Sequence, residues 1–186
     1  LSVEVAGYRS SSESGTTLAP IDGTSAFRVV RSPERIWGGE ISIDWSVNES
    51  LNLKANYSRV DGKFDPDLDG VYEQMSSFRI TPEKLVVQAN YEFSADWSLF
   101  VQGLYSFDHK PFGNEISSPG KNPIDAFFLL DVSVTGQIGR GFLSVSGSNI
   151  LNKDYESAYS QSLKSDPFAF YKAPGAELSI QYTIDY

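Results

Sequence analysis

The sequence predicts an all-β fold in which about eight antiparallel strands form the wall of a membrane-embedded barrel. Apolar and polar residues alternate over most of the chain, which is the period of a β-strand with one apolar face. Very short connections between these segments alternate with long ones along the chain, as in barrels whose long loops all lie at one end. No segment approaches the ~18–20 apolar residues of a transmembrane helix.

Each predicted strand places its apolar side chains on one face and its polar side chains on the other. In residues 39–47, Ile41 and Trp45 alternate with Ser42 and Asp44. Period-2 alternation of this kind indicates a strand with two unlike faces. Strands are expected, in chain order, at residues 1–8, 39–47, 51–57, 85–93, 97–107, 127–138, 141–148 and 176–186.

The connectors distinguish the two ends of this sheet. Three are very short, at residues 48–50, 94–96 and 139–140, and four are long, at residues 9–34, 62–80, 108–125 and 149–175. Because successive strands run in opposite directions, the short connectors share one end and the long ones the other. Outer-membrane barrels have this asymmetry, with short periplasmic turns and long extracellular loops. The serine-rich stretch at residues 10–12 is expected to be flexible loop.

Aromatic residues gather near both ends of the apolar face. Trp45, Tyr91, Phe93 and Trp97 lie near the short turns, and Tyr57, Tyr105 and Phe107 lie near the long loops. Membrane interfaces select two such girdles. A soluble β-sandwich or β-barrel is the alternative that also alternates. It is disfavoured because the inward face is strongly polar, which a sandwich core does not tolerate.

Composition excludes several classes of function. The formal net charge is −9, with 24 acidic and 15 basic residues, whereas nucleic-acid binding requires a basic footprint. Cysteine is absent, and His109 is the single histidine, so thiolate sites and sites with several histidines are excluded. No nucleophile–base arrangement is recognisable, since His109 is the one candidate base. Neither an enzymatic activity nor a cofactor is expected.

The end of the sequence has the features of a terminal barrel strand. Tyr182, Ile184 and Tyr186 continue the apolar alternation up to the last residue. A terminal strand that ends in an aromatic residue resembles the assembly signal that the barrel-assembly machinery reads in bacterial outer-membrane proteins. The sequence therefore predicts that Tyr182, Ile184 and Tyr186 act in assembly.

Several motifs resemble those of TonB-dependent outer-membrane receptors of the siderophore-receptor type. Residues 146–155, SGSNILNKDY, resemble the end of the last-but-one strand of that family, and residues 173–186 resemble its final strand. Upstream, Gly38-Gly39-Glu40 and residues 80–85, ITPEKL, resemble its strand openings. The arginine that usually follows Pro-Gly is missing, because the chain has Pro174-Gly175-Ala176. In order and spacing the motifs cover residues 38–186.

The resemblance implies a 22-stranded barrel in the bacterial outer membrane with a plug domain in its lumen. Residues 1–186 would be its carboxy-terminal segment, and the plug and the amino-terminal strands would lie outside it. The implied function is active uptake of a bulky nutrient, most often an iron–siderophore complex. The implied partners are the plug, the TonB complex, the barrel-assembly machinery, outer-membrane lipid and a ferric siderophore. A closed eight-stranded barrel with a structural or adhesive role is the alternative.

Two sets of residues are candidates for contacts within such a receptor. Loop residues that would meet a ligand are Tyr72, His109, Phe112, Tyr159, Phe168, Phe170 and Tyr171. Polar strand residues that would face the lumen and the plug are Glu40, Asp44, Lys54, Asn56, Gln88, Asn90, Glu92, Asp131 and Gln181.

One acidic loop carries a possible metal motif. Asp65, Asp67 and Asp69 precede Gly70 with the spacing of the first half of a calcium-binding loop. The twelfth position is Ser76 rather than the bidentate glutamate, so an acidic surface turn is the favoured interpretation.

Overall fold

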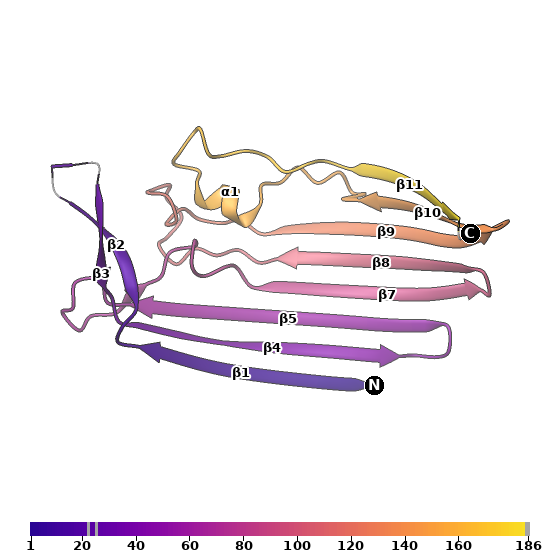
Figure 1. Cartoon of the computed structure of the whole chain (residues 1–186), viewed down its shortest axis with the longest axis horizontal. Coiled ribbons are helices and arrows are strands. Elements are labelled where there is room, and N and C mark those ends of the chain that lie inside the picture. Colours follow the sequence, from indigo (N-terminus) through magenta and orange to yellow (C-terminus); the bar gives the residue numbers. More distant parts are fainter. Residues whose placement is uncertain (22, 25, 185–186) are drawn as a thin grey trace.

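Eight long strands form one antiparallel sheet in which every strand lies beside its neighbours in the sequence. The structure is a computed structural model that describes all residues except 22, 25, 185 and 186. The sheet order is β1-β4-β5-β7-β8-β9-β10-β11 (Figure 1). The strands are β1 (Ser2–Ser12), β4 (Glu34–Ser46), β5 (Leu51–Phe64), β7 (Lys84–Ser94), β8 (Trp97–Ser106), β9 (Phe127–Ile138), β10 (Gly141–Ser148) and β11 (Glu177–Ile184).

The eight strands and the sheet class predicted from the alternation are confirmed, but three strands extend further than expected. β1 continues through Ser12, which pairs with Glu34 at the start of β4. β4 begins at Glu34, before the predicted start at residue 39, and β5 continues to Phe64, beyond the predicted end at residue 57. The prediction that residues 10–12 form a flexible loop is wrong, because pairing with β4 satisfies the polar groups of this backbone.

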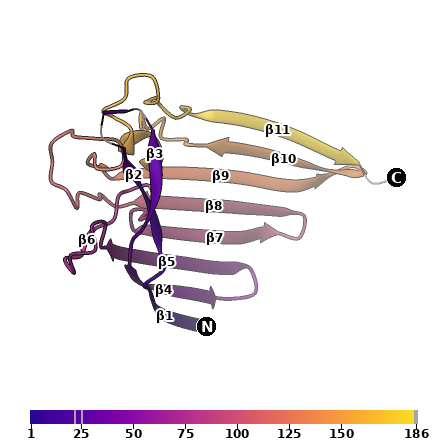
Figure 2. The ribbon, with the colours of Figure 1, turned by 60° about the vertical axis from the view of Figure 1, so that its left-hand side comes forward.

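Three small elements lie within the long loops and were not predicted. They are the hairpin of β2 (Thr16–Pro20) and β3 (Phe27–Arg31), the short strand β6 (Glu73–Gln74), which pairs with β5, and the helix α1 (Ala158–Ser162). All of them lie at the same end of the sheet, opposite the short turns (Figures 1 and 2). The separation of long loops from short turns, expected from the connector lengths, is therefore present in the structure.

The strand register gives the sheet two unlike faces. On the apolar face, Val5, Ile41, Tyr57, Leu85, Tyr105 and Phe128 lie opposite one another in a row across six strands. On the polar face, Asp44, Lys54, Gln88, Gln102 and Asp131 form a corresponding row. A slip of one residue in any pair would exchange the two faces, so the alternating sequence fixes this register.

No second layer covers the apolar face in the described part of the chain, and its large side chains are exposed or half-buried. Among the described residues, the buried apolar side chains that make up the core are Met75, Ile80 and Ile124, all in the long loops. No helix of the described residues is long and apolar enough to cross a membrane.

The sheet has two open edges, β1 and β11, which do not pair with each other in the described residues. The expected alternative, in which the eight strands close on themselves, is therefore not the arrangement of this structure. An open strand edge leaves backbone N–H and C=O groups without partners, which is costly in hydrocarbon.

Candidate functional site

The polar face carries two groups of side-chain contacts, one between β4 and β5 and one across β7, β8 and β9. Lys54 Nζ lies 3.0 Å from Asp44 Oδ2. Further along the row, Gln88 Nε2 donates to Gln102 Oε1 at 2.8 Å, and Gln102 Nε2 donates to Asp131 Oδ2 at 3.2 Å. Within each group the polar side chains satisfy one another across strand boundaries, which favours one arrangement of these side chains.

The nine residues predicted to face the lumen lie on this one face, because the register connects them in rows. Glu92 lies opposite Ser98, and the same row continues through Thr135 and Ser144 to Gln181. Asn90 lies opposite Asn52, two residues from Lys54 on β5. Asn56 accepts a hydrogen bond from Ser42 Oγ at 2.6 Å, and Glu40 lies two residues from Ser42 on β4.

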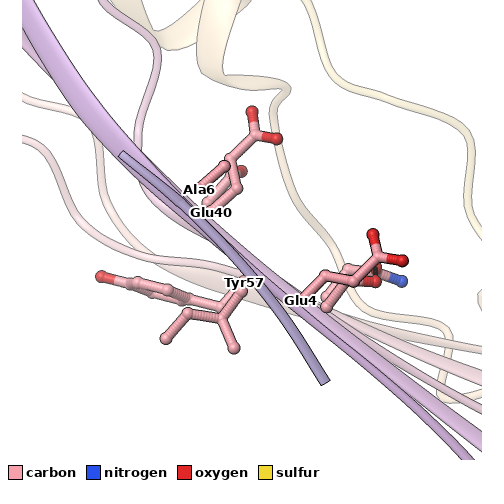
Figure 3. Close-up of a pocket in the computed structure, with 8 residues that line it drawn as sticks. Glu4, Ala6, Glu40 and Tyr57 are labelled. Atoms are coloured by element: carbon pink, nitrogen blue, oxygen red, sulfur yellow. Dashed lines mark hydrogen bonds between the residues drawn. The ribbon is translucent and has the colours of Figure 1, made fainter. Parts of the chain in front are cut away.

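The β1–β4–β5 corner of the polar face is acidic and slightly hollowed. A shallow cavity of about 450 Å³ lies over it, and Glu4, Glu40 and Asn56 contribute to its lining. Glu4, Ala6 and Glu40 project from one side of the sheet and Tyr57 from the other (Figure 3). The corner offers carboxylates to the polar side, while Tyr57 belongs to the apolar face.

An apolar island lies on the polar face, and the sequence analysis did not identify it. Val86, Leu104 and Leu129 lie opposite one another on β7, β8 and β9. Leu104 and Leu129 both fall at positions where strict alternation places a polar residue. The signal in the sequence is a local break in the alternation of each strand. Only the strand register shows that these breaks lie side by side.

The long loops are joined into one cluster around α1. Gly120 N–H donates to the Ser162 carbonyl at 2.8 Å, and Ser77 N–H donates to the Gly120 carbonyl at 2.7 Å. The buried Asn122 side chain donates to the Ser162 carbonyl, and Gln161 exchanges two hydrogen bonds with the Asp125 backbone. Three loops that are distant in sequence are therefore fixed relative to one another. This cluster, residues 75–80, 118–125 and 157–165, is called the loop cluster below.

The structure does not bring all the predicted ligand-binding aromatics into one site. Three of them contact side chains of their own chain: Arg35 stacks over Tyr72, Lys121 lies over Phe112, and Tyr159 packs against Phe78. Phe170 is half-buried. Phe168 and Tyr171 remain exposed, with Phe168 98% accessible. Tyr171 is held through its backbone, which exchanges two hydrogen bonds with Ser160 Oγ.

His109 lies where the loop cluster meets the sheet. Its backbone pairs with Ile124, and its Nε2 atom is buried without a hydrogen-bond partner in the described residues. Burial lowers the pKa of the imidazole, while Asp61, Glu83 and Asp108 oppose this shift. The side chain is therefore neutral near pH 7. Beside it, the bond from Lys110 lowers the pKa of Asp125.

The acidic turn of residues 65–70 folds onto its own backbone. Asp65 Oδ2 accepts the Gly70 N–H at 3.0 Å, and Asp69 Oδ1 accepts the Val71 N–H at 2.7 Å. Within the part of the chain that the structure describes, no three His, Cys, Asp or Glu residues are grouped to hold a metal ion. The geometry of Asp65, Asp67 and Asp69 thus gives no support to calcium binding.

The SGSNILNKDY segment forms a tight turn that connects three strands. Asn149 has a positive φ of 46°, its N–H donates to Asp131 Oδ1 at 2.8 Å, and its side chain bonds the Lys153 backbone twice. Asn152 Oδ1 accepts the Ala176 N–H just before β11. At the other end of β11, Tyr182 Oη donates to the Ile138 carbonyl and Ile184 lies opposite Gly141. Tyr186 lies outside the described residues.

Comparison with known proteins gives the fold. No family model matches the sequence. Among solved structures, the copper transporter OprC superposes with a TM-score of 0.79 at 16% identity, covering 99% of this chain and 28% of OprC. The ferric-catecholate import receptor Fiu from E. coli K12 gives 0.66 at 14% identity, covering 98% of this chain and 25% of Fiu. The siderophore receptor PiuA from Acinetobacter baumannii gives 0.66 at 13% identity, covering 99% and 26%.

The chain spans about a quarter of the length of the solved structures that it matches. At 13–16% identity the likeness shows the fold and leaves cargo and activity open. The all-β outer-membrane class predicted from alternation and connector lengths is confirmed by these superpositions. The chain has the fold of part of the barrel of a TonB-dependent outer-membrane receptor.

Proposed function

We propose that residues 1–186 form the carboxy-terminal wall of a TonB-dependent active-transport receptor in the bacterial outer membrane. The observation that carries this proposal is the opposite character of the two sheet faces, continuous across all eight long strands. An exposed apolar face suits lipid, and a hydrogen-bonded polar face suits a wet lumen. The two open edges need further strands, which fits a segment of a larger barrel.

In this receptor the polar face encloses the transport path. The row from Asp44 to Asp131 and the acidic corner at Glu40 would meet the plug through hydrogen bonds and ion pairs. A polar, hydrated contact allows the plug to move without exposing apolar surface. Coupling to the TonB complex, the plug itself and the remaining strands belong to parts of the receptor outside residues 1–186.

The proposed cargo is an iron–siderophore complex, captured first by the extracellular loops. Fiu and PiuA, which share the fold, are named for ferric-catecholate import and for siderophore reception. Phe168 and Tyr171 are exposed aromatic side chains among the predicted loop contacts, and Tyr159, which is also exposed, packs against Phe78. Exposed rings held on an ordered loop suit the flat aromatic groups of a catecholate ligand. A copper cargo is the competing possibility, since OprC is named a copper transporter.

The test is uptake by the whole protein that carries this chain, made in a bacterium that lacks its own ferric-siderophore receptors. Radiolabelled iron is supplied as a ferric catecholate, with and without TonB. We expect TonB-dependent uptake, reduced about tenfold by Phe168→Ala with Tyr171→Ala, a loss of about 1.4 kcal/mol of binding free energy. Ile116→Ala is the control, because Ile116 is an apolar loop residue that is 61% exposed, close to the 64% of Tyr171.

Three other results would change the proposal. Uptake of copper but not of iron would move the cargo to the free metal and leave the transport function standing. Uptake that does not require TonB would contradict active transport. No uptake of either, together with an intact mass of about 20 kDa for the protein from the outer membrane, would leave a structural or adhesive barrel.

A further inference from the structure

The polar face of the sheet is divided into two parts that differ in charge. On β1, β4, β5 and β7 this face carries the charged side chains of Glu4, Glu40, Asp44, Lys54, Lys84 and Glu92. On β8 to β11, between the Gln102–Asp131 row and the short turns, no described residue of this face is charged. This uncharged part is called the neutral strip below. Its hydroxyl side chains on β9 to β11 are Ser133, Thr135, Ser144, Ser146, Ser179 and Thr183.

The hydroxyl groups at the centre of the neutral strip are paired with one another. Thr135 Oγ1 donates to Ser144 Oγ at 3.0 Å, and the Oγ atoms of Ser133 and Ser146 are 2.9 Å apart. At the border toward the loops, both carboxylate oxygens of Asp131 already accept hydrogen bonds. Polar groups that are paired within the wall gain little free energy by bonding to another molecule. These groups therefore hold neither the plug nor a cargo molecule tightly.

Large apolar side chains occur at regular intervals along the neutral strip and its border. Leu104, of the apolar island, lies four residues from Phe100 on β8, about 13 Å along the strand. Phe100 lies opposite Ser133, and Phe142 lies opposite Gln137, four residues further along β9, so the second interval is again roughly 13 Å. Phe100 is half-buried and Phe142 is 48% exposed. Apolar surface facing a wet lumen is unfavourable, so these side chains gain free energy when another molecule covers them.

Two properties of a ferric catecholate fit this arrangement. Its aromatic rings are flat and pack well against phenylalanine and leucine side chains. It carries a net negative charge, which the carboxylates of the charged part of the wall repel and the neutral strip does not. Separate contacts also suit movement, because a transported molecule must bind strongly enough to enter a path and weakly enough to leave each position.

The plug fits the neutral strip less well. A protein domain that rests on a wall buries a contiguous apolar patch, whereas Leu104, Phe100 and Phe142 stand about 13 Å apart. The charged part of the wall, with Glu40 and Asp44, offers the hydrogen-bonding and ion-pairing groups that a polar plug surface requires. The two parts of the wall thus suit two different partners.

We propose that the cargo crosses the lumen along the neutral strip, and that Leu104, Phe100 and Phe142 contact its aromatic groups in succession. The inference rests on the proposed function and adds the route that the cargo takes once the plug has moved. This route is separate from the first capture of the cargo. Phe100 lies three residues from the short-turn end of β8, about 10 Å along the strand, whereas the loops lie at the opposite end (Figure 1).

The test uses the whole receptor that carries this chain, in a bacterium that lacks its own ferric-siderophore receptors. A radiolabelled ferric tris-catecholate is supplied, and two quantities are measured: the Kd of surface binding without TonB, and the uptake rate at saturating cargo with TonB. We expect Phe100→Ser with Phe142→Ser to lower the uptake rate about fivefold, through the loss of aromatic contacts. The Kd should stay the same. Phe100→Tyr with Phe142→Tyr keeps both rings and should retain most of the rate.

A second set of variants tests the charge of the neutral strip. Ser144→Asp should also lower the uptake rate about fivefold, because a carboxylate then faces the anionic cargo. Ser144→Asn is the matched control, since it has the same size, carries no charge and can still accept the hydrogen bond from Thr135. It should retain most of the rate. Ser58→Asp places the same charge on the charged part of the wall, opposite Lys84, and should have little effect.

Other results would overturn the inference. Heat-dependent gel mobility and an unchanged Kd check that each variant is folded. Wild-type uptake rates in Phe100→Ser with Phe142→Ser and in Ser144→Asp would show that the cargo passes elsewhere, while the proposed function would stand. Entry of vancomycin without TonB in the phenylalanine variants would show that these side chains hold the plug instead. Absence of uptake by the wild type would overturn the proposed function itself, and this route with it.

Discussion

The sheet and the loop cluster depend on their surroundings in opposite ways. Large apolar side chains of the strands are half-buried or exposed, and exposure reaches 74% at Val5 and 68% at Ile180 on the two edge strands. In the loops, Met75, Ile80 and Ile124 are at most 1% exposed. In most proteins the regular elements hold the core and the loops cover it. Here no part of the described chain covers the apolar side chains of the strands, whereas the loops contain their own small core.

This difference follows from where the hydrophobic driving force acts. The apolar face of the sheet gains free energy when lipid covers it, so the strands are stabilised by the membrane and by neighbouring strands. The loop cluster stands in water, and it must bury Met75 and Ile124 within itself and satisfy Asn122 and Gln161 internally. Each region should therefore respond to a different kind of substitution.

The largest expected effect is on the membrane side of the sheet. Val101 and Gln102 are neighbours on β8, and the register assigns Val101 to the apolar face and Gln102 to the polar face. Val101→Arg should destabilise the receptor folded in lipid vesicles by about 2–4 kcal/mol, because the guanidinium then faces the bilayer centre. Urea titration of the vesicle-embedded receptor measures this loss.

Gln102→Arg is the matched control, since it introduces the same charge one residue away. It should cost much less than Val101→Arg, because the lumen wall is polar and Asp131 accepts a bond from this position. Equal costs at the two positions, or a larger cost at Gln102, would contradict the assignment of the faces.

A smaller effect is expected in the loop cluster. Met75 is fully buried, with its sulphur beside Gly62 of β5. Met75→Ala should destabilise the cluster by about 2–3 kcal/mol through loss of buried contacts and the cavity left behind. Amide exchange should accelerate at Ser77 and Gly120, whose N–H groups hold the loops together.

Met75→Leu keeps the volume and should change this exchange little. The urea midpoint of the sheet in vesicles should stay the same in both variants. A Met75→Ala effect that spread to the strands would show that the two regions fold as one unit, which would remove the distinction between them.

The strands were predictable because their information is local. Period-2 alternation fixes both the existence of a strand and its face, which is why all nine predicted polar-face residues lie on one face. The extension of β1 through Ser12 was not predictable in this way, because polar serines become strand only when β4 pairs with them. The five-residue helix α1 is too short for a periodic signal.

The contacts between the loops could not be predicted from the sequence, for a different reason. Tyr72 and Tyr159 look alike as exposed loop aromatics, yet their partners, Arg35 and Phe78, come from other segments of the chain. The apolar island on the polar face likewise becomes visible only when the register joins Val86, Leu104 and Leu129. Contacts between segments that are distant in sequence decide whether a loop aromatic packs or stays free and which side chains form an island. A local sequence pattern carries no information about such contacts.

The smallest effect is expected at Asn149, where the sheet and the loops meet. Its side chain is buried, its φ is positive, and it bonds the Lys153 backbone while its N–H bonds Asp131. Asn149→Ala should cost about 1–2 kcal/mol, through lost hydrogen bonds and a left-handed conformation that alanine adopts reluctantly. Asn149→Gly loses the same side-chain bonds but accepts the positive φ, so it should cost less. Urea titration in vesicles, compared with amide exchange at Lys153 and Ala176, tells whether the loss belongs to the strands or to the loops. If alanine and glycine are equally harmful, the left-handed backbone contributes nothing and the turn is held by its hydrogen bonds alone.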